Sequence, residues 1–176
     1  NSNLSDLALV YCKYAIINTK GVVDPDGFVV PLDTTIRGMV FNKLLSGNKI
    51  LSSGSGVLIK RSVFDIVGRF NETLRFGEDW DMWLRIAEKY EVDYAEKVLV
   101  HIRRHEDNMT ASKRKVFEGE ISFYRAWLPY LRVQKIAVPL RWKIKILYKT
   151  VTLFPSLSLI RKALPVLFVP CNTSHK

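Results

Sequence analysis

Three carboxylates lie among large apolar side chains in one short segment of the chain, residues 77–85. The segment reads Gly-Glu-Asp-Trp-Asp-Met-Trp-Leu-Arg, so its acids are Glu78, Asp79 and Asp81. A carboxylate is costly to bury without a partner, so acids interleaved with tryptophan, methionine and leucine require a specific role. These acids either cap and decorate a helix or face a site.

The residues around these acids have the spacing of a helix with one apolar face. Steps of three and four residues separate the members of that face, Met82, Trp83, Ile86, Ala87 and Tyr90. The acids fall in the first turn, where the helix dipole favours a negative charge by about 0.3–1 kcal/mol. Asp79 shares the apolar face, so it is either an N-cap or a site carboxylate. Asp81 precedes Arg85 by four residues, the favoured order of a helix-surface pair, and a place in a site is an equal alternative.

Strand and helix patterns alternate along the rest of the chain. A short apolar run predicts a buried strand at residues 7–12, the run at 57–59 predicts another strand, and a third strand is expected between residues 90 and 100. Helical spacing predicts helices over residues 34–45 and 113–128, and a short helix from Ser62 to a stop at Gly68. This alternation is typical of an α/β domain.

Length and composition indicate a globular protein with a real core, since the chain has 176 residues and 48% of them are hydrophobic. Its two cysteines, Cys12 and Cys171, lie near opposite ends and have no metal-ligand spacing. A reducing compartment, the cytoplasm, is the simplest interpretation.

The net charge of +10 is concentrated in the tail, because no Asp or Glu follows Glu120. After Pro139, helical spacing relates the apolar residues Leu140, Ile144, Leu147, Tyr148, Val151 and Phe154, with Arg141, Lys145 and Lys149 opposite. Residues 156–170 are apolar but too interrupted for a spanning helix. We expect an interfacial helix on the inner, anionic face of the cytoplasmic membrane, where each cation is worth about 1 kcal/mol. The alternative is a helix packed on another part of the protein, with solvated lysines.

Three further motifs are weak when taken singly. Asp24-Pro25-Asp26-Gly27 has two carboxylates that a divalent ion could use, but its composition favours a tight turn. The glycines of Ser53-Gly54-Ser55-Gly56 allow a ligand to approach the backbone, or they form a plain connection. His105 either binds a metal ion or phosphate, or is solvated in a charged loop.

The order of the motifs is more specific than any one of them. A small-residue loop opens a strand at residues 52–60, and Val-Gly-Arg-Phe-Asn-Glu follows at 67–72. The acidic helix start comes next at 77–85, and Ile-Arg-Arg-His-Glu-Asp-Asn-Met-Thr closes the set at 102–110. In this order the chain resembles the family 2 glycosyltransferases of the GT-A fold, over roughly residues 7–127. Ile102 stands where the family's last motif has an aromatic residue.

The resemblance implies roles for the matching positions. Asp79 would be the general base that takes a proton from an acceptor hydroxyl, a role worth about 10²–10⁴-fold in rate, and Glu78 would orient the site or the acceptor. His105 would approach a divalent metal, Mg²⁺ or Mn²⁺, or the donor diphosphate. The implied substrate-binding residues are Gly54, Ser55, Gly56, Trp80 and Arg103.

The resemblance also implies an architecture. Residues 1–128 would be the C-terminal, acceptor-side half of a Rossmann-like α/β GT-A domain, and residues 129–176 a basic amphipathic helical tail. Family members carry a nucleotide-binding N-terminal half that ends in an Asp-x-Asp metal motif, upstream of the strand that matches residues 7–12. Because Asp24-Pro25-Asp26 follows that strand, it is not the missing motif. We therefore expect a fragment that is inactive by itself.

The enzyme expected from this resemblance is an inverting glycosyltransferase of bacterial cell-surface polysaccharide or glycolipid synthesis. Its partners would be a nucleotide-sugar donor, a hydroxyl acceptor on a glycan or lipid-linked sugar, and an anionic membrane. The alternatives are a non-catalytic basic module that binds membrane or nucleic acid, and an enzyme-like scaffold that binds sugars without transfer. Nucleic acid is the less expected partner, because aromatic residues are not interleaved with basic ones outside the tail.

Overall fold

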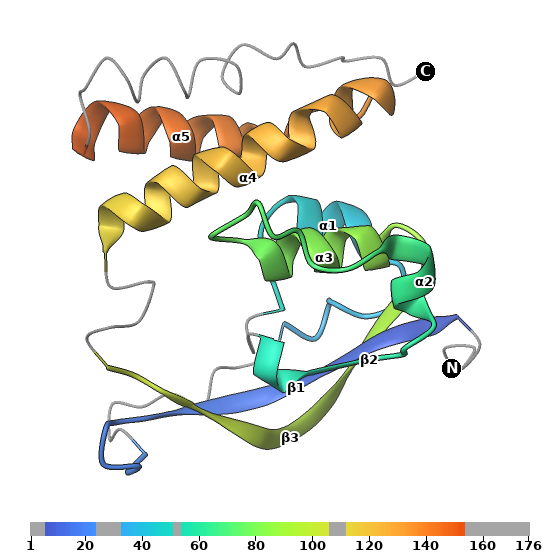
Figure 1. Ribbon diagram of the computed structural model, residues 1–176, viewed down its shortest axis with the longest axis vertical. Coiled ribbons are helices and arrows are strands. Elements are labelled where there is room, and N and C mark those ends of the chain that lie inside the picture. Colours follow the sequence, from blue (N-terminus) through green and yellow to red (C-terminus); the bar gives the residue numbers. More distant parts are fainter. Residues whose placement is uncertain (1–5, 24–32, 51–53, 106–111, 154–176) are drawn as a thin grey trace. The chain divides into compact units, whose positions relative to one another are not determined.

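The computed structural model describes residues 6–23, 33–50, 54–105 and 112–153, and side chains as far as residue 148 (Figure 1). The chain forms two compact units, which we describe separately. The first comprises residues 1–71 and 79–111, and the second comprises residues 72–78 and 112–176. The longer segment of the second unit begins at residue 112 and contains the helix of residues 113–133, which packs with the helix that follows it. The domain boundary expected at residue 129 stays a prediction.

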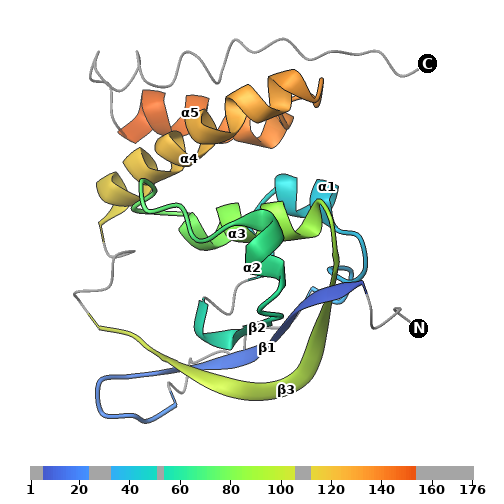
Figure 2. The ribbon, with the colours of Figure 1, turned by 45° about the vertical axis from the view of Figure 1, so that its right-hand side comes forward.

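The first unit is built on a three-stranded sheet of order β2-β1-β3. The central strand, β1 (Leu7–Ile17), pairs antiparallel with β2 (Val57–Ile59) and parallel with β3 (Glu91–Arg103). Three helices belong to the same unit, α1 (Phe41–Leu45), α2 (Val63–Val67) and α3 (Glu78–Ala87). Figures 1 and 2 show α1 and α3 on one face of the sheet. The expected α/β class is confirmed.

The helix predicted over residues 34–45 is confirmed only at its end, as α1. Its apolar residues Ile36 and Val40 are buried as the pattern requires, but they lie in irregular chain. Gly38 breaks the helix there, because it has φ +76° and forms an antiparallel bridge with Val92 of β3. The Tyr11 hydroxyl then fastens the segment to β1 by donating to the carbonyl of Ile36 at 3.2 Å.

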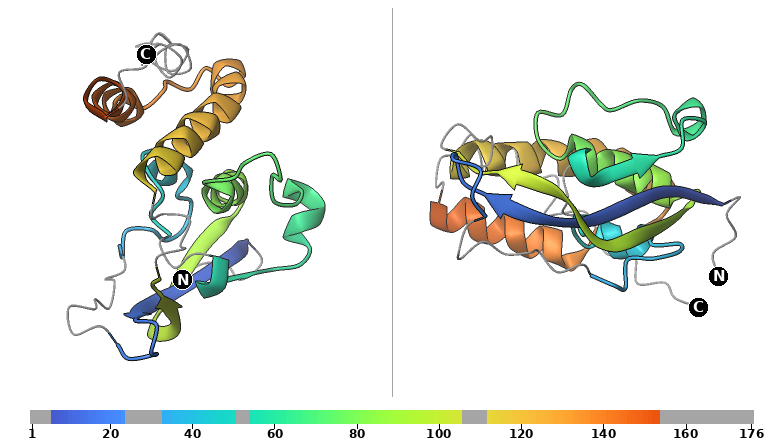
Figure 3. Two further views of the ribbon diagram at one scale, coloured as in Figure 1. Left: turned by 60° about the vertical axis from the view of Figure 1, so that its left-hand side comes forward. Right: turned by 90° about the horizontal axis from the view of Figure 1, so that it is seen from below.

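The second unit consists of residues 72–78 and the helices α4 (Lys113–Val133) and α5 (Leu140–Leu153), which pack against each other (Figure 3). Helix α4 runs past the predicted end at residue 128, with Pro129 inside it. It ends in a Schellman motif, in which Ile136 N–H donates to Leu131 at 2.8 Å and Lys135 N–H to Arg132 at 3.1 Å. Lys135 takes the left-handed conformation, φ +55°, that glycine usually fills there.

Residues 72–78 are attached to α4 by a close approach at Gly119. A Cβ atom on Gly119 would lie 2.3 Å from the Cβ of Phe76, so only glycine fits between the helix and this segment. Gly77 follows with φ +77°, and a Cβ there would lie 3.2 Å from the Phe123 ring. The chain that leads into α3 is therefore held against α4.

No helix among the described residues is long and apolar enough to cross a membrane.

Candidate functional site

Asp79 lies one residue inside α3, not at its N-cap, because the helix begins at Glu78. Its carboxylate is half-buried and accepts the backbone N–H of Trp80 at 2.6 Å. N–H groups in the first turn of a helix lack intrahelical acceptors, and the helix dipole favours negative charge there. The Asp79 carboxylate therefore lies at the end of the helix where negative charge is favoured. Glu78 precedes it and is also half-buried.

Trp80 is an anchor of α3. Its side chain is buried, and its indole N–H donates to the carbonyl of Leu44 in α1 at 2.8 Å. The donor group of the ring is therefore engaged within the first unit. The implied contact between Trp80 and substrate stays a prediction, limited to the small part of the ring that is exposed.

Asp81 and Arg85 form the ion pair that their spacing indicated, but the pair does not lie at the surface. Asp81 is only 6% exposed, and its Oδ2 accepts Nε and Nη2 of Arg85 at 3.0 and 2.8 Å. The same guanidinium donates to the carbonyls of Val67 at the end of α2 and of Arg69 beyond it, at 2.5 and 2.9 Å. Arg85 therefore supplies hydrogen-bond donors to two carbonyls that accept no hydrogen bond within α2.

This contact joins two of the sequence motifs. The guanidinium belongs to the 77–85 motif, and the carbonyls it binds belong to the 67–72 motif. A second link between them is the edge-to-face contact of Phe70 with Trp83, whose ring centroids lie 6.3 Å apart. The guanidinium of Arg85, bound to Asp81 and to the carbonyls of Val67 and Arg69, forms a clamp between the two motifs. The sequence did not predict this clamp. The available signal was Gly68, a helix stop whose neighbouring carbonyls need a hydrogen-bond donor, which an arginine can supply.

The small-residue loop forms a single turn of 3₁₀ helix at Gly54–Gly56, which lies against β1 and β3. Gly54 and Ser55 are exposed and Gly56 is buried. Among the described residues other than its chain neighbours, no atom lies within 4 Å of the position that a Gly54 Cβ would take, so these residues leave the backbone open to close approach on that side. Figures 1 and 2 place this turn on the sheet side of the N-terminal end of α3. Ser53 lies outside the described residues.

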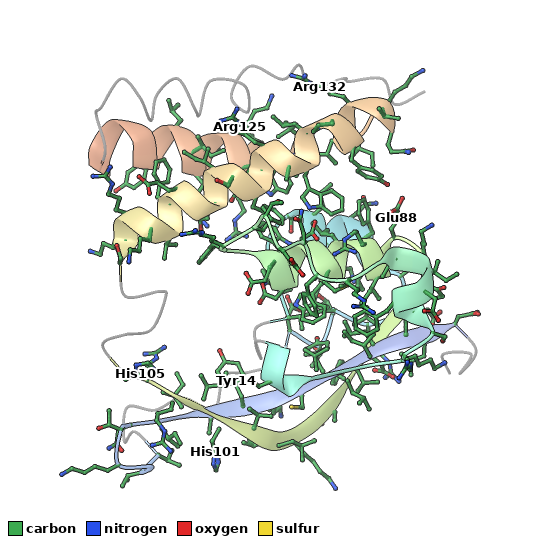
Figure 4. The ribbon with its side chains drawn as sticks, in the orientation of Figure 1. Tyr14, Glu88, His101, His105, Arg125 and Arg132 are labelled. Carbon is green, nitrogen blue, oxygen red and sulfur yellow. The ribbon has the colours of Figure 1, made fainter. Side chains whose placement is uncertain are left out.

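Arg103 ends β3 and fastens the turn that follows β1. Its Nη1 donates to the carbonyls of Asn18 and Thr19, each at 2.9 Å. His105 lies exposed just beyond the strand (Figure 4). The rest of this motif, residues 106–110, lies outside the described residues.

Tyr14 lies on β1 (Figure 4). Burial raises the pKa of its hydroxyl, and the positive charge of Arg104 partly offsets that rise. Tyr14 therefore stays protonated at neutral pH.

The part of the chain that the structure describes does not contain a complete set of ligands for a divalent metal ion. No group of three His, Cys, Asp or Glu side chains gathers there. One histidine does not make a divalent-cation site, so His105 as a metal ligand stays a prediction, and no chemical step is assigned to a metal here. Asp24 and Asp26 lie outside the described residues, so the turn predicted at that motif stays a prediction as well.

Comparison with known proteins adds a family to this geometry. The sequence model of the family described as glycosyltransferase like family 2 matches residues 5–153. A protein named as an uncharacterized glycosyltransferase from Rickettsia felis is 29% identical over 103 residues, which cover 56% of this chain and 16% of that protein. A second such protein, from Rickettsia typhi, is 25% identical over 128 residues, which cover 73% of this chain and 40% of that protein. The chain thus spans less than half the length of these relatives.

Proposed function

The chain belongs to the family described as glycosyltransferase like family 2, and from that membership we propose that the protein containing it transfers a sugar from a nucleotide-sugar donor to a hydroxyl acceptor. The relatives' names support transfer of a glycosyl group without naming a donor or an acceptor. We assign the activity to the whole protein, because the chain spans 16% and 40% of the two relatives described above.

The observation that carries the mechanism is the different use of the acids around α3. Asp81 is committed to the buried pair with Arg85 and supports the fold. Asp79 lies half-buried in the first turn of α3, where its carboxylate accepts the backbone N–H of Trp80. We assign the general-base role to Asp79 and an orienting role to Glu78.

The reaction that fits these residues is an inverting, in-line displacement. The Asp79 carboxylate takes the proton of the acceptor hydroxyl while the hydroxyl oxygen forms a bond to the anomeric carbon. The bond between that carbon and the diphosphate oxygen breaks, and the nucleoside diphosphate leaves with the electron pair. Such a base contributes about 10²–10⁴-fold to the rate.

The leaving diphosphate needs positive charge around it. A divalent ion would supply that charge in the whole enzyme, and the described residues of this chain do not form a site for it. The exposed side chains at the end of β3, Arg103 and Arg104, are the cations of this unit that we assign to the phosphates. The acceptor is proposed to be a glycan or lipid-linked sugar of the bacterial cell surface.

The reaction is tested with the full-length protein and a panel of UDP-, GDP- and dTDP-activated sugars. The readout is acceptor-dependent release of nucleoside diphosphate, and NMR of the product reports the anomeric configuration. We expect one donor to react and the configuration to invert. Retention would refute the single-base mechanism, and binding of donor without turnover across the panel would favour a sugar-binding scaffold.

A further inference from the structure

Helix α5 has two apolar faces, and the first of them is buried within the second unit. Trp142 and Ile146 form that face, and the Trp142 ring stacks on Tyr124 of α4 with centroids 4.6 Å apart. Lys145 adds an ion pair to Glu120 of α4 at 2.5 Å. These contacts hold α5 to α4, so the helix does not need its other apolar face for folding.

The second apolar face of α5 is exposed. Its members are each more than half accessible to solvent, namely Leu140, Ile144, Leu147 and Tyr148. They follow one another at steps of four, three and one residues, which places them in a continuous row on one side of the helix. A contiguous row of large apolar side chains marks an interaction site, unlike apolar residues scattered singly over a surface.

The charged side chains bordering this row are basic. Helical periodicity places Arg141 at one edge of the row and Lys143 at the other. Figure 4 shows two more cations of the unit, Arg125 and Arg132, on one side of α4. No Asp or Glu follows Glu120 in the whole sequence. An apolar row with a cation at each edge complements an anionic bilayer, where acyl chains lie just beneath phosphate groups.

We propose that α5 docks on an anionic lipid surface, with the Leu140–Ile144–Leu147–Tyr148 row inserted at the level of the headgroups and the cations on lipid phosphates. Charge selects lipid over a second copy of this chain, because two copies meeting through α5 would bring basic edges together. The face that inserts is the one opposite Trp142 and Ile146, so α5 binds lipid without leaving α4. This inference is independent of the transfer reaction.

The test is co-sedimentation of the 176-residue chain with vesicles of phosphatidylcholine, alone or mixed with phosphatidylglycerol. We expect binding to the mixed vesicles that weakens as salt is raised, because the cations act within a Debye length of the surface. Ile144→Ser and Leu147→Ser should each lower the partition coefficient about tenfold, since each removes an inserted aliphatic side chain. Arg141→Gln should lower it about fivefold.

Ile66→Ser is the matched control, because Ile66 of α2 is 59% exposed and Ile144 is 57% exposed. Its partition coefficient should equal that of the unchanged chain, and far-UV circular dichroism should show both variants folded. Equal binding by Ile144→Ser and the unchanged chain would overturn the proposal, as would no binding to either vesicle. Sedimentation velocity tests whether a second copy of this chain occupies the face. A dimer that Ile144→Ser dissociates would assign the face to that copy and overturn the lipid assignment.

Discussion

Replacing Arg85 with lysine tests the clamp that joins α3 to the chain after α2. Lysine keeps one positive charge for Asp81 but cannot also bind the carbonyls of Val67 and Arg69, which the planar guanidinium reaches at 2.5 and 2.9 Å. A hydrogen bond to a charged group is worth about 1.5–3 kcal/mol, and the Arg85 side chain is 24% exposed, so water replaces part of the loss. We expect Arg85→Lys to lower the free energy of unfolding by about 2 kcal/mol. In thermal unfolding this loss corresponds to a midpoint that is lower by about 4–8 °C.

The partner substitution, Asp81→Asn, removes the carboxylate from a largely buried guanidinium. Loss of one member of a fully buried pair costs about 3–5 kcal/mol, and because Arg85 is partly exposed we expect a smaller cost, about 2–3 kcal/mol. A double-mutant cycle of Asp81→Asn and Arg85→Lys should show a coupling of about 1 kcal/mol or more, because the two side chains share two hydrogen bonds.

The assay is urea unfolding of the chain followed by far-UV circular dichroism, with hydrogen exchange to locate the effect in residues 63–72. Arg114→Lys is the control, because Arg114 pairs with Glu118 at the same four-residue spacing and a 3.0 Å distance but at an exposed position. It should change the unfolding free energy by about 0.5 kcal/mol or less. If Arg85→Lys costs no more than Arg114→Lys, or leaves exchange in residues 63–72 unchanged, the reasoning about the clamp is refuted.

Three further predictions concern backbone conformation, packing and pH. Lys135→Gly should raise the unfolding free energy by about 1 kcal/mol in thermal unfolding, because it removes a left-handed non-glycine residue from the Schellman motif; a lower midpoint would contradict this. Gly119→Ala should lower it by about 1–3 kcal/mol by forcing a methyl group into Phe76, and an unchanged midpoint would contradict the close approach. The hydrogen bond from the Thr35 hydroxyl is the largest of the effects that hold the pKa of the Asp33 carboxyl below its ordinary value. The stability that this carboxyl contributes to the fold is therefore complete at neutral pH. It is lost as the pH falls below about 3.9, the ordinary pKa of the unfolded chain, and through the lower pKa of the folded chain. Thr35→Val should therefore destabilise the chain at pH 7 and progressively less in acid, and a gap that is independent of pH would refute that linkage.

Local patterns were enough to predict most elements of the fold. The strands beginning at Leu7 and Val57 and the helices beginning near Val63, Lys113 and Leu140 follow from runs, periodicity and caps. The helix predicted over residues 34–40 was wrong, because the buried side chains there have the spacing of a helix although the backbone is not helical. The positive φ of Gly38 and its bridge to β3 determine the backbone conformation instead. Those are tertiary constraints that spacing does not encode.

The candidate site divides in the same way. A carboxylate in the first turn of α3 was predictable from the Gly-Glu-Asp spacing. The burial of the pair that Asp81 forms with Arg85 was not, because Arg85 also binds the backbone carbonyls of Val67 and Arg69, and a carbonyl leaves no mark in residue type. The use of Arg103 to hold the turn after β1 was hidden for the same reason.

The exposed row on α5 was visible as helical periodicity from Leu140 onward. What the structure added is which apolar residues are not in that row. Trp142 and Ile146 are buried, and Lys145, placed opposite the row by spacing, pairs with Glu120. Periodicity gives the angle between side chains on a helix but not which angle faces the neighbouring helix.

The most direct test of the proposed mechanism is the turnover number of Asp79→Asn in the full-length protein, beside Asp81→Asn and the unchanged enzyme. Asparagine keeps the size and the hydrogen bond to the Trp80 N–H but cannot take a proton. We predict that Asp79→Asn lowers kcat by about 10²–10⁴-fold with an unchanged unfolding midpoint, whereas Asp81→Asn lowers the midpoint. Transfer by Asp79→Asn at the rate of the unchanged enzyme would contradict the assignment of Asp79 as the base.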